Sequence, residues 1–291
     1  MSRDGRTDER GDRPGPATAD RVRPDGRTPL VPLERLTLRP GGDRQPVVHR
    51  GHTYQLRDAD VRTLATVGAF RVVRAAELQD MRSSRDAWTG TIRHLREQGL
   101  IEVKTVTINR EATAVAVLTR AGKSLLDAHR DRSTDREPQA FHAGLVKPRE
   151  LAHDAQLYRL FQAEAARIEA DGGRVDRVLL DYELKREYQT FLNRPKTGDD
   201  DGDDMAAFAA EHDLPIIDGH LELPDLRIEY ETPDGPLLYR DVELVTEHYS
   251  RSQLAGKTRA GFSLYRAVGA GGANPRTGGT PFDPHHLEWL G

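Results

Sequence analysis

The chain has 291 residues and no cysteine. It therefore contains no disulfide, no thiolate metal site and no cysteine nucleophile. It also lacks any run of 18 apolar residues, and its first residues lack the apolar core of a signal sequence. We therefore expect no membrane insertion and no export, and we expect a cytoplasmic protein. The glycines of residues 269–279 lack the strand, loop and helix context of a nucleotide-binding loop.

Net charge is divided unevenly along the chain, although the whole-chain value is only −4. Residues 50–130 hold 14 Lys and Arg against 9 Asp and Glu, a net +5, whereas residues 131–291 hold 19 against 30, a net −11. A basic unit joined to an acidic one is typical of a DNA reader with a separate effector part. The length also favours two domains of ordinary size.

Residues 86–118 carry the most informative local pattern. Trp88, Ile92, Leu95 and Leu100 form one apolar stripe, which predicts a helix that ends at Gly99. The β-prone residues of 101–108 and 115–118 flank a polar turn at 109–113 and predict a two-stranded hairpin.

Two further helices are expected ahead of this unit and one behind it. Apolar residues from Val61 to Phe70 predict the first helix, residues 73–81 the second, and Thr119 is the expected N-cap of a closing helix. Three helices followed by a hairpin are typical of a winged helix-turn-helix, which we assign to residues 48–130. Such a unit places one helix in the major groove of duplex DNA.

Polar and basic side chains on the third helix and the wing are the candidate DNA contacts. Arginine can read guanine edges, and lysine or arginine can hold phosphates. The candidates are Arg85, Thr89, Arg93, His94, Arg96, Lys104 and Arg110. The alternative is that these side chains are solvated surface charges and that the module contacts a protein instead of DNA.

The remaining polar segments separate or flank the folded parts. We expect a disordered arm at residues 1–47, a linker at 131–144, a solvated acidic loop at 197–204 and a C-terminal tail at 271–291. The tail carries Trp289, which would suit a small apolar anchor.

The second folded part, residues 145–270, alternates helices and strands. A long helix over residues 147–173 is followed by a strand at 174–184, a short helix near 186–194, two strands around a turn at 233–235, and a final helix over 250–268. This order predicts an α/β (α+β) fold with a mixed sheet.

The chain resembles the replication-relaxation family, winged-helix proteins associated with bacterial plasmids and other mobile elements. The similarity spans residues 48–268 and rests on element order and four short motifs: LxHD at 151–154, PD at 224–225, ExV at 243–245 and the helix from Lys257 to Tyr265. It implies a DNA-binding protein of plasmid replication or transfer, with double-stranded DNA, a second copy and a replication or transfer protein as partners.

The C-terminal part of that family is similar to the restriction-endonuclease-like PD-(D/E)xK nuclease fold. The resemblance places Asp225 and Glu243 at the catalytic and metal positions, with Glu150 or Asp154 as a further carboxylate. Two such carboxylates can hold Mg²⁺ against a phosphodiester, while a lysine steadies the attacking water. Residue 245 is valine where the motif has lysine, and Lys257 is the candidate substitute.

Three interpretations follow. The first is a DNA-binding protein with a nuclease-like domain that does not cut, and Val245 favours it. The second is a Mg²⁺-dependent endonuclease or nickase that uses Asp225, Glu243 and Lys257. The third is a protein-interaction adaptor, to which the acidic half and Trp289 point.

Overall fold

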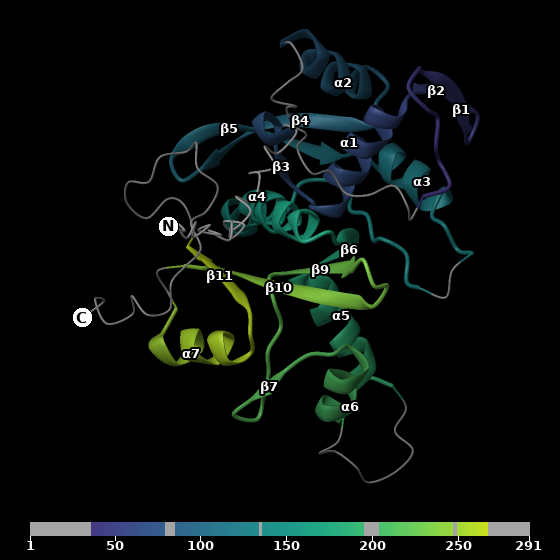
Figure 1. Ribbon diagram of the computed structural model, residues 1–291. Helices are drawn as coiled ribbons and strands as arrows, with labels where there is room; N and C mark the ends of the chain where they lie inside the picture. Colours follow the sequence, from purple (N-terminus) through teal and green to yellow (C-terminus); the bar gives the residue numbers. More distant parts are fainter. Residues whose placement is uncertain (1–35, 79–84, 134–135, 195–203, 247–248, 267–291) are drawn as a thin grey trace, which may run out of the picture.

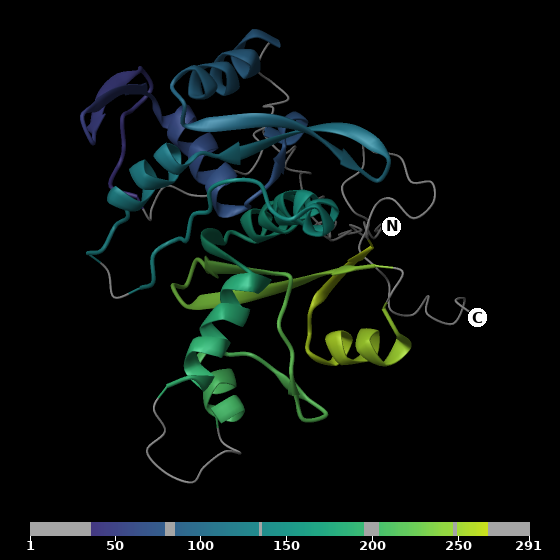
Figure 2. The ribbon, with the colours of Figure 1, turned by 180° about the vertical axis from the view of Figure 1, so that it is seen from behind.

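The computed structural model describes residues 36–78, 85–133, 136–194, 204–246 and 249–266, and for residues 85–89 it describes the backbone alone. The fold mixes helices with several sheets, as the sequence predicts. One helix, α4 (Pro148–Ala170), lies between an N-terminal half above it and a four-stranded sheet below it (Figures 1 and 2). No helix in these ranges is long and apolar enough to cross a membrane.

The N-terminal half contains a short hairpin, a three-stranded sheet and the helices around it. Its elements are β1 (Gln45–His49), β2 (His52–Leu56), α1 (Asp58–Ala69), β3 (Val73–Arg74), the 3-10 turn η1 (Ala75–Leu78), α2 (Arg85–Glu97), β4 (Ile101–Ile108), β5 (Glu111–Leu118) and α3 (Arg120–Ala128). The strand order is β3-β5-β4, and all pairs are antiparallel.

The hairpin β4–β5 and the helix after it confirm the sequence prediction, except that the turn predicted at 109–113 spans only residues 109 and 110, and β5 already begins at Glu111. Asn109 and Arg110 form the turn at φ values of 50° and 69°, the left-handed backbone that a tight two-residue hairpin requires. Thr119 caps α3, because its hydroxyl accepts a hydrogen bond of 3.0 Å from the Gly122 amide.

The helix predicted over residues 73–81 is wrong in its first part. Val73 and Arg74 instead form a strand against Ala116 and Val115, followed by the single 3-10 turn η1. β-branched residues at 72 and 73 favour a strand where a sheet edge is available. Residues 79–81 lie outside the described part of the chain.

Residues 1–35 of the predicted arm lie outside the described part of the chain, but residues 36–38 and the linker predicted at 131–144 differ from the prediction. Leu36 is 2% exposed and bridges to Arg130, and Leu38 is also buried. In the linker, Phe141 is buried and the Gln139 side chain bonds the backbone of Val178. Apolar residues inside polar stretches dock these segments on the core.

The C-terminal half carries a mixed sheet with the strand order β11-β10-β9-β6, in which β10 and β11 are parallel and the other pairs antiparallel. Its elements are β6 (Arg174–Leu180), α5 (Asp181–Leu192), α6 (Asp204–Glu211), β7 (Ile216–Ile217), β8 (His220–Leu221), β9 (Leu226–Glu231), β10 (Leu237–Val245), α7 (Arg251–Arg259) and β11 (Ser263–Arg266). The mixed sheet confirms the prediction, but the strand predicted at 174–184 ends at Leu180. Residues 181–184 instead begin α5, where the Glu183 carboxylate accepts a hydrogen bond of 3.2 Å from the Leu180 amide.

The final helix predicted over residues 250–268 is shorter in the structure. It ends at Arg259, and Gly261 at φ +80° turns the chain into β11. The strand buries Leu264 beside Val245 and Phe262 in a small apolar cluster. Of the acidic loop predicted at 197–204, the structure describes only Asp204, which begins α6. The C-terminal tail predicted at 271–291 lies outside the described residues.

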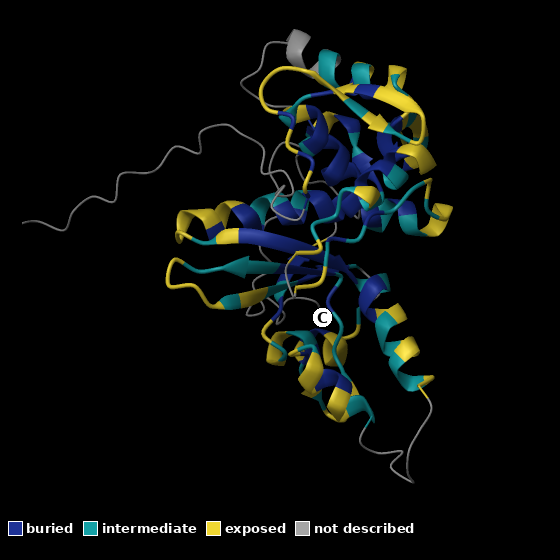
Figure 3. Ribbon diagram, turned by 90° about the vertical axis from the view of Figure 1, so that its right-hand side faces the viewer, coloured by how far each residue is buried: buried dark blue, intermediate teal, exposed yellow. Residues whose placement is uncertain are grey.

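A continuous core joins the two halves across α4. The Phe70 ring, just after α1, lies 5.2 Å from Tyr158 and 5.1 Å from Phe161 between ring centroids. Buried residues accordingly follow α4 and the sheet beneath it (Figure 3). The halves therefore share one core, unlike domains joined by a free linker.

Candidate functional site

The outer surface of the N-terminal half carries the predicted DNA-contact residues. On α2, Arg93 is 72% exposed at its side chain and pairs with Glu97 at 2.7 Å, and Arg96 is exposed. Arg85 and Thr89 belong to the same helix, but only their backbone is described. Isoleucine and leucine at 92 and 95 are buried on the opposite face. The amphipathic pattern therefore leaves a basic face on the outside.

His94 has a different setting from its neighbours on α2. Its Nε2 lies 2.6 Å from the backbone carbonyl oxygen of Gln55 in β2, and the side-chain amide of Gln98 donates to the same oxygen at 2.9 Å. The backbone amide of Gln55 donates in turn to the side-chain oxygen of Gln98 at 2.7 Å. The ring of His94 thus fixes α2 against the hairpin β1–β2.

The hairpin β4–β5 carries the remaining two candidates. Lys104 on β4 is half-exposed and pairs with Glu102 at 2.8 Å, while Arg110 lies in the exposed turn between β4 and β5. Ion pairs between exposed side chains add little to stability because water screens them. Lys104 can therefore exchange Glu102 for another anion at little cost.

Asp225 and Glu243 meet at the end of the pairing between β9 and β10. Asp225 Oδ2 accepts a hydrogen bond of 2.8 Å from the Leu244 amide, and Glu243 Oε2 accepts one of 3.3 Å from the Asp225 amide. In the antiparallel register Val242 lies opposite Leu226, and the next pair along the two strands is therefore Glu243 and Asp225. The sequence motifs placed these two carboxylates together, and the structure does the same.

Lys257 reaches this pair from α7. Its Nζ lies 3.3 Å from Glu243 Oε1 and 3.2 Å from Glu222 Oε2, and it donates to the carbonyl of Leu223 at 2.7 Å. Tyr249 also donates to Glu243 Oε1, at 2.5 Å. Burial and the charge of Asp225 raise the pKa of Glu243 to about 7, although Lys257 opposes this shift. The carboxyl group of Glu243 is therefore partly protonated near neutral pH.

His153 on α4 is a second cation beside this pair of carboxylates. We call Asp225, Glu243 and the charged and polar side chains around them the acidic cluster. Its Nε2 lies 3.1 Å from Asp225 Oδ1, and its Nδ1 lies 3.2 Å from Asp154 Oδ1. Burial alone would lower the pKa of this imidazole, but the hydrogen bonds and charges of the two aspartates raise it to about 10. His153 is therefore an imidazolium held between two carboxylates at neutral pH.

Glu150, the predicted further metal ligand, is held elsewhere. Arg71 lies just after α1, at φ +62°, and its side chain pairs with Glu150 at 2.9 Å and with Asp154 at 3.3 Å. The same guanidinium lies 4.4 Å from the centroid of the Tyr182 ring. Arg71 therefore ties the N-terminal half to the start of α4, and only Asp154 is connected to Asp225, through His153.

Three members of this cluster were not singled out by the sequence. Glu222 and Tyr249 bind Lys257 and Glu243 as described, and Lys185 on α5 lies near the acidic pair. Burial lowers the pKa of Lys185, but its hydrogen bond to Asp181 and the charges of Asp225 and Glu243 raise it overall. None of the three belongs to a recognisable motif, because each comes from a different segment.

The donor set does not fit a Mg²⁺ centre in this arrangement. Mg²⁺ requires oxygen ligands in near-octahedral geometry. Here Asp225 and Glu243 already bind the cations His153 and Lys257, and Glu150 is bound by Arg71. Across the described ranges no three His, Cys, Asp or Glu residues are grouped to hold a metal. A metal would first have to displace a protein cation.

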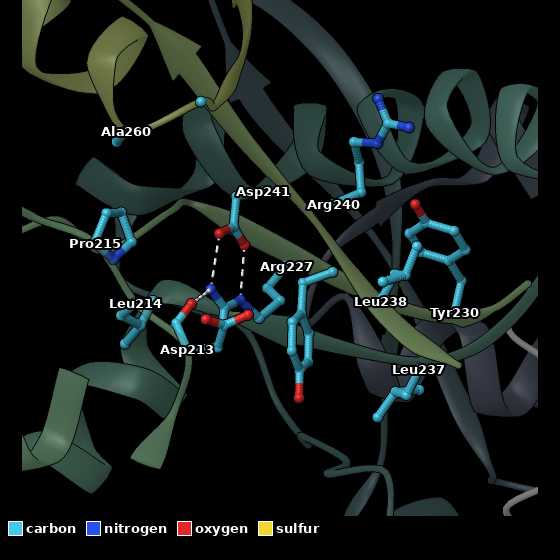
Figure 4. Close-up of a pocket in the computed structure, with 12 residues that line it drawn as sticks. Asp213, Leu214, Pro215, Arg227, Tyr230, Leu237, Leu238, Arg240, Asp241 and Ala260 are labelled. Carbon is cyan, nitrogen blue, oxygen red and sulfur yellow. Dashed lines mark hydrogen bonds and ion pairs between the residues drawn. The ribbon is translucent and has the colours of Figure 1, made fainter. Parts of the chain in front are cut away.

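A separate cavity of about 550 Å³ lies beside β9 and β10 (Figure 4). Asp241 binds Arg227 through two contacts of 2.7 Å, and the backbone carbonyl of Asp213 accepts a third from the same guanidinium at 3.0 Å. The guanidinium also lies 4.6 Å from the Tyr239 ring centroid. These contacts satisfy Arg227 within the fold, which indicates a structural role in joining the sheet to the segment after α6.

No protein-family model matches the chain, and neither a curated protein nor a solved structure matches it.

Proposed function

We propose that this chain is a double-stranded DNA-binding protein whose N-terminal half is a winged helix and whose nuclease-like C-terminal half does not cut DNA. The supporting observation is topological. The order α1, β3, η1, α2, β4, β5, with β3 and β4 on either side of β5, agrees with a winged helix in which α2 would be the recognition helix and β4–β5 the wing. The resemblance to the replication-relaxation family agrees with this assignment.

The surface chemistry of α2 supports DNA as the partner. Arg93 and Arg96 are exposed on a helix whose apolar face is fixed to the core, and Arg110 extends the basic surface to the wing. Rigid presentation on a helix favours base reading, because side chains then enter the groove in a fixed register. A second copy would read a repeated half-site, and a replication or transfer protein of a mobile element would be a further partner.

The simplest test is a mobility shift with Arg93→Ala/Arg96→Ala. We expect the double variant to bind duplex DNA at least tenfold more weakly, since each good arginine contact discriminates by about 1–3 kcal/mol. Arg149→Gln/Arg186→Gln removes the same charge from exposed positions of the C-terminal half and is expected to bind as the wild type does. Equal affinity of all three proteins would refute the role of α2.

The acidic cluster supports the non-cutting half of the proposal. Asp225 is bound by the imidazolium of His153 and Glu150 by Arg71, as in a structural ion network, whereas the contact of Lys257 with Glu243 fits either interpretation. Incubation of supercoiled DNA with the protein and Mg²⁺, Mn²⁺ or EDTA is expected to give a mobility shift without metal-dependent cleavage. Cleavage that needs metal and disappears in Asp225→Asn would instead establish the endonuclease interpretation, with Lys257 as its lysine.

A further inference from the structure

A small basic pocket lies between the turn of the hairpin β1–β2 and α3. It has a volume of about 340 Å³, and its charged lining consists of His49, Arg50, Arg120, Lys123 and Asp127. The single carboxylate is already neutralised, because Asp127 pairs with Lys123 and, at 2.7 Å, with Arg130. The pocket therefore presents a net positive charge to the solvent.

Arg50 and Arg120 supply the uncompensated charge of the pocket. Both are exposed, and neither has a carboxylate partner among the residues that the structure describes. Arg50 and Gly51 form the two-residue turn of the hairpin, Arg50 at φ +48°, and Arg50 lines the pocket from this turn. Arg120 is the first residue of α3, where the helix dipole adds to the positive potential.

The hairpin that carries the pocket is fixed at two places. His49 Nε2 lies 2.9 Å from the hydroxyl of Ser124 on α3, and Gln55 at the other end bonds α2 through His94 and Gln98. In both ribbon views β1–β2 lies beside α2 with α3 next to it (Figures 1 and 2). The pocket is therefore a preformed part of the surface that also carries α2, which lowers the entropic cost of binding there.

We propose that this pocket binds a phosphate group, and that in the DNA complex this group belongs to the backbone beside the bases read by α2. The inference rests on the proposed DNA-binding function. Two arginines without a carboxylate partner beside a concave site suit a phosphate, which arginine can bind through two parallel hydrogen bonds. Such a contact would set the register of α2 without reading sequence.

The test compares Arg50→Asn/Arg120→Gln with the wild type in duplex binding over a range of salt concentrations. Asparagine tolerates the left-handed backbone at residue 50. We expect affinity at 150 mM salt to fall about tenfold and the slope of log K against log salt to fall by about 1–2, since each phosphate contact contributes about 0.9. The loss should be equal for specific and unrelated sequences. Arg149→Gln/Arg186→Gln is the charge-matched control, and thermal unfolding verifies that all variants fold.

Two outcomes separate this inference from the proposed function. If the wild type binds duplex and Arg50→Asn/Arg120→Gln shows the same affinity and salt slope, the pocket does not contact phosphate, although the DNA-binding function stands. If the wild type binds no duplex, DNA binding fails, and titration with inorganic phosphate monitored by NMR of the His49 ring tests the pocket alone. Shifts that disappear in the variant would then support a phosphate site, and unchanged spectra would overturn it.

Discussion

Replacing His153 with alanine is expected to lower the free energy of unfolding by about 3 kcal/mol at pH 7, the low end of the range for removing one partner of a buried ion pair. The imidazolium lies between Asp154 and Asp225, at 3.2 and 3.1 Å. Its removal leaves both aspartates with less positive charge to balance them, and Asp225 also lies beside the buried Glu243. Urea unfolding of the two proteins measures the difference.

The pH dependence of this difference identifies the imidazolium as its source. The aspartates outweigh burial and raise the pKa of His153 from 6.5 to about 10. From about pH 6.5 to 10 the folded chain retains a proton that the unfolded chain has released, so stability falls as the pH rises. The contribution of His153 is fully present below this window and lost above it. Wild type should therefore lose more stability between pH 7.5 and 9.5 than His153→Ala.

The control is His220→Ala, which removes an exposed histidine of β8 and should change little at either pH. Parallel pH profiles for the wild type and His153→Ala would contradict a protonated His153. A loss of stability without any pH dependence would show that the side chain contributes by packing alone.

The sequence predicted the elements of this fold wherever the local pattern matched the final environment. Alternation and turn residues were sufficient for β4–β5, and the short PD and ExV motifs were sufficient to place Asp225 beside Glu243. The strand β3 was mistaken for helix because its two residues gain their hydrogen bonds only from β5, which lies about 40 residues later.

The cations of the acidic cluster were harder to predict than its carboxylates. Lys257 and Tyr249 come from the chain after β10, and their approach to Glu243 depends on how α7 packs. His153 belongs to the LxHD motif, but its position between two aspartates follows from the contact of α4 with the sheet. Local periodicity carries no information about such long-range contacts.

Val245 occupies the position where the nuclease motif has lysine. The structure buries it at 6% exposure against Leu254, Phe262 and Leu264. A lysine at this position would have to place its charge in that apolar cluster. The cation therefore comes from α7, one element away.

Lys257→Met is expected to destabilise the protein much more at alkaline than at acidic pH. Glu243 is 2% exposed, and burial together with Asp225 raises its pKa from 4.5 to about 7. At pH 5 its carboxyl is protonated, so the substitution removes only the contacts of Lys257 with Glu222 and the Leu223 carbonyl, at a cost of about 1 kcal/mol. At pH 8.5 the ionised Glu243 loses its cation, and the expected loss rises to about 3 kcal/mol.

A double-mutant cycle with Glu243→Gln isolates this interaction. In Lys257→Met the pKa of Glu243 rises further, because Lys257 is the cation that opposes the shift. Glu243→Gln/Lys257→Met carries neither charge, so it should recover most of the stability at pH 8.5 and show no comparable pH dependence. Arg259→Met on the same helix removes an exposed arginine paired with Asp218 and should behave alike at both pH values. An equal loss at pH 5 and pH 8.5 for Lys257→Met would mean that Lys257 does not neutralise Glu243, and the acidic pair would then lack the protein cation that sets it apart from a metal centre.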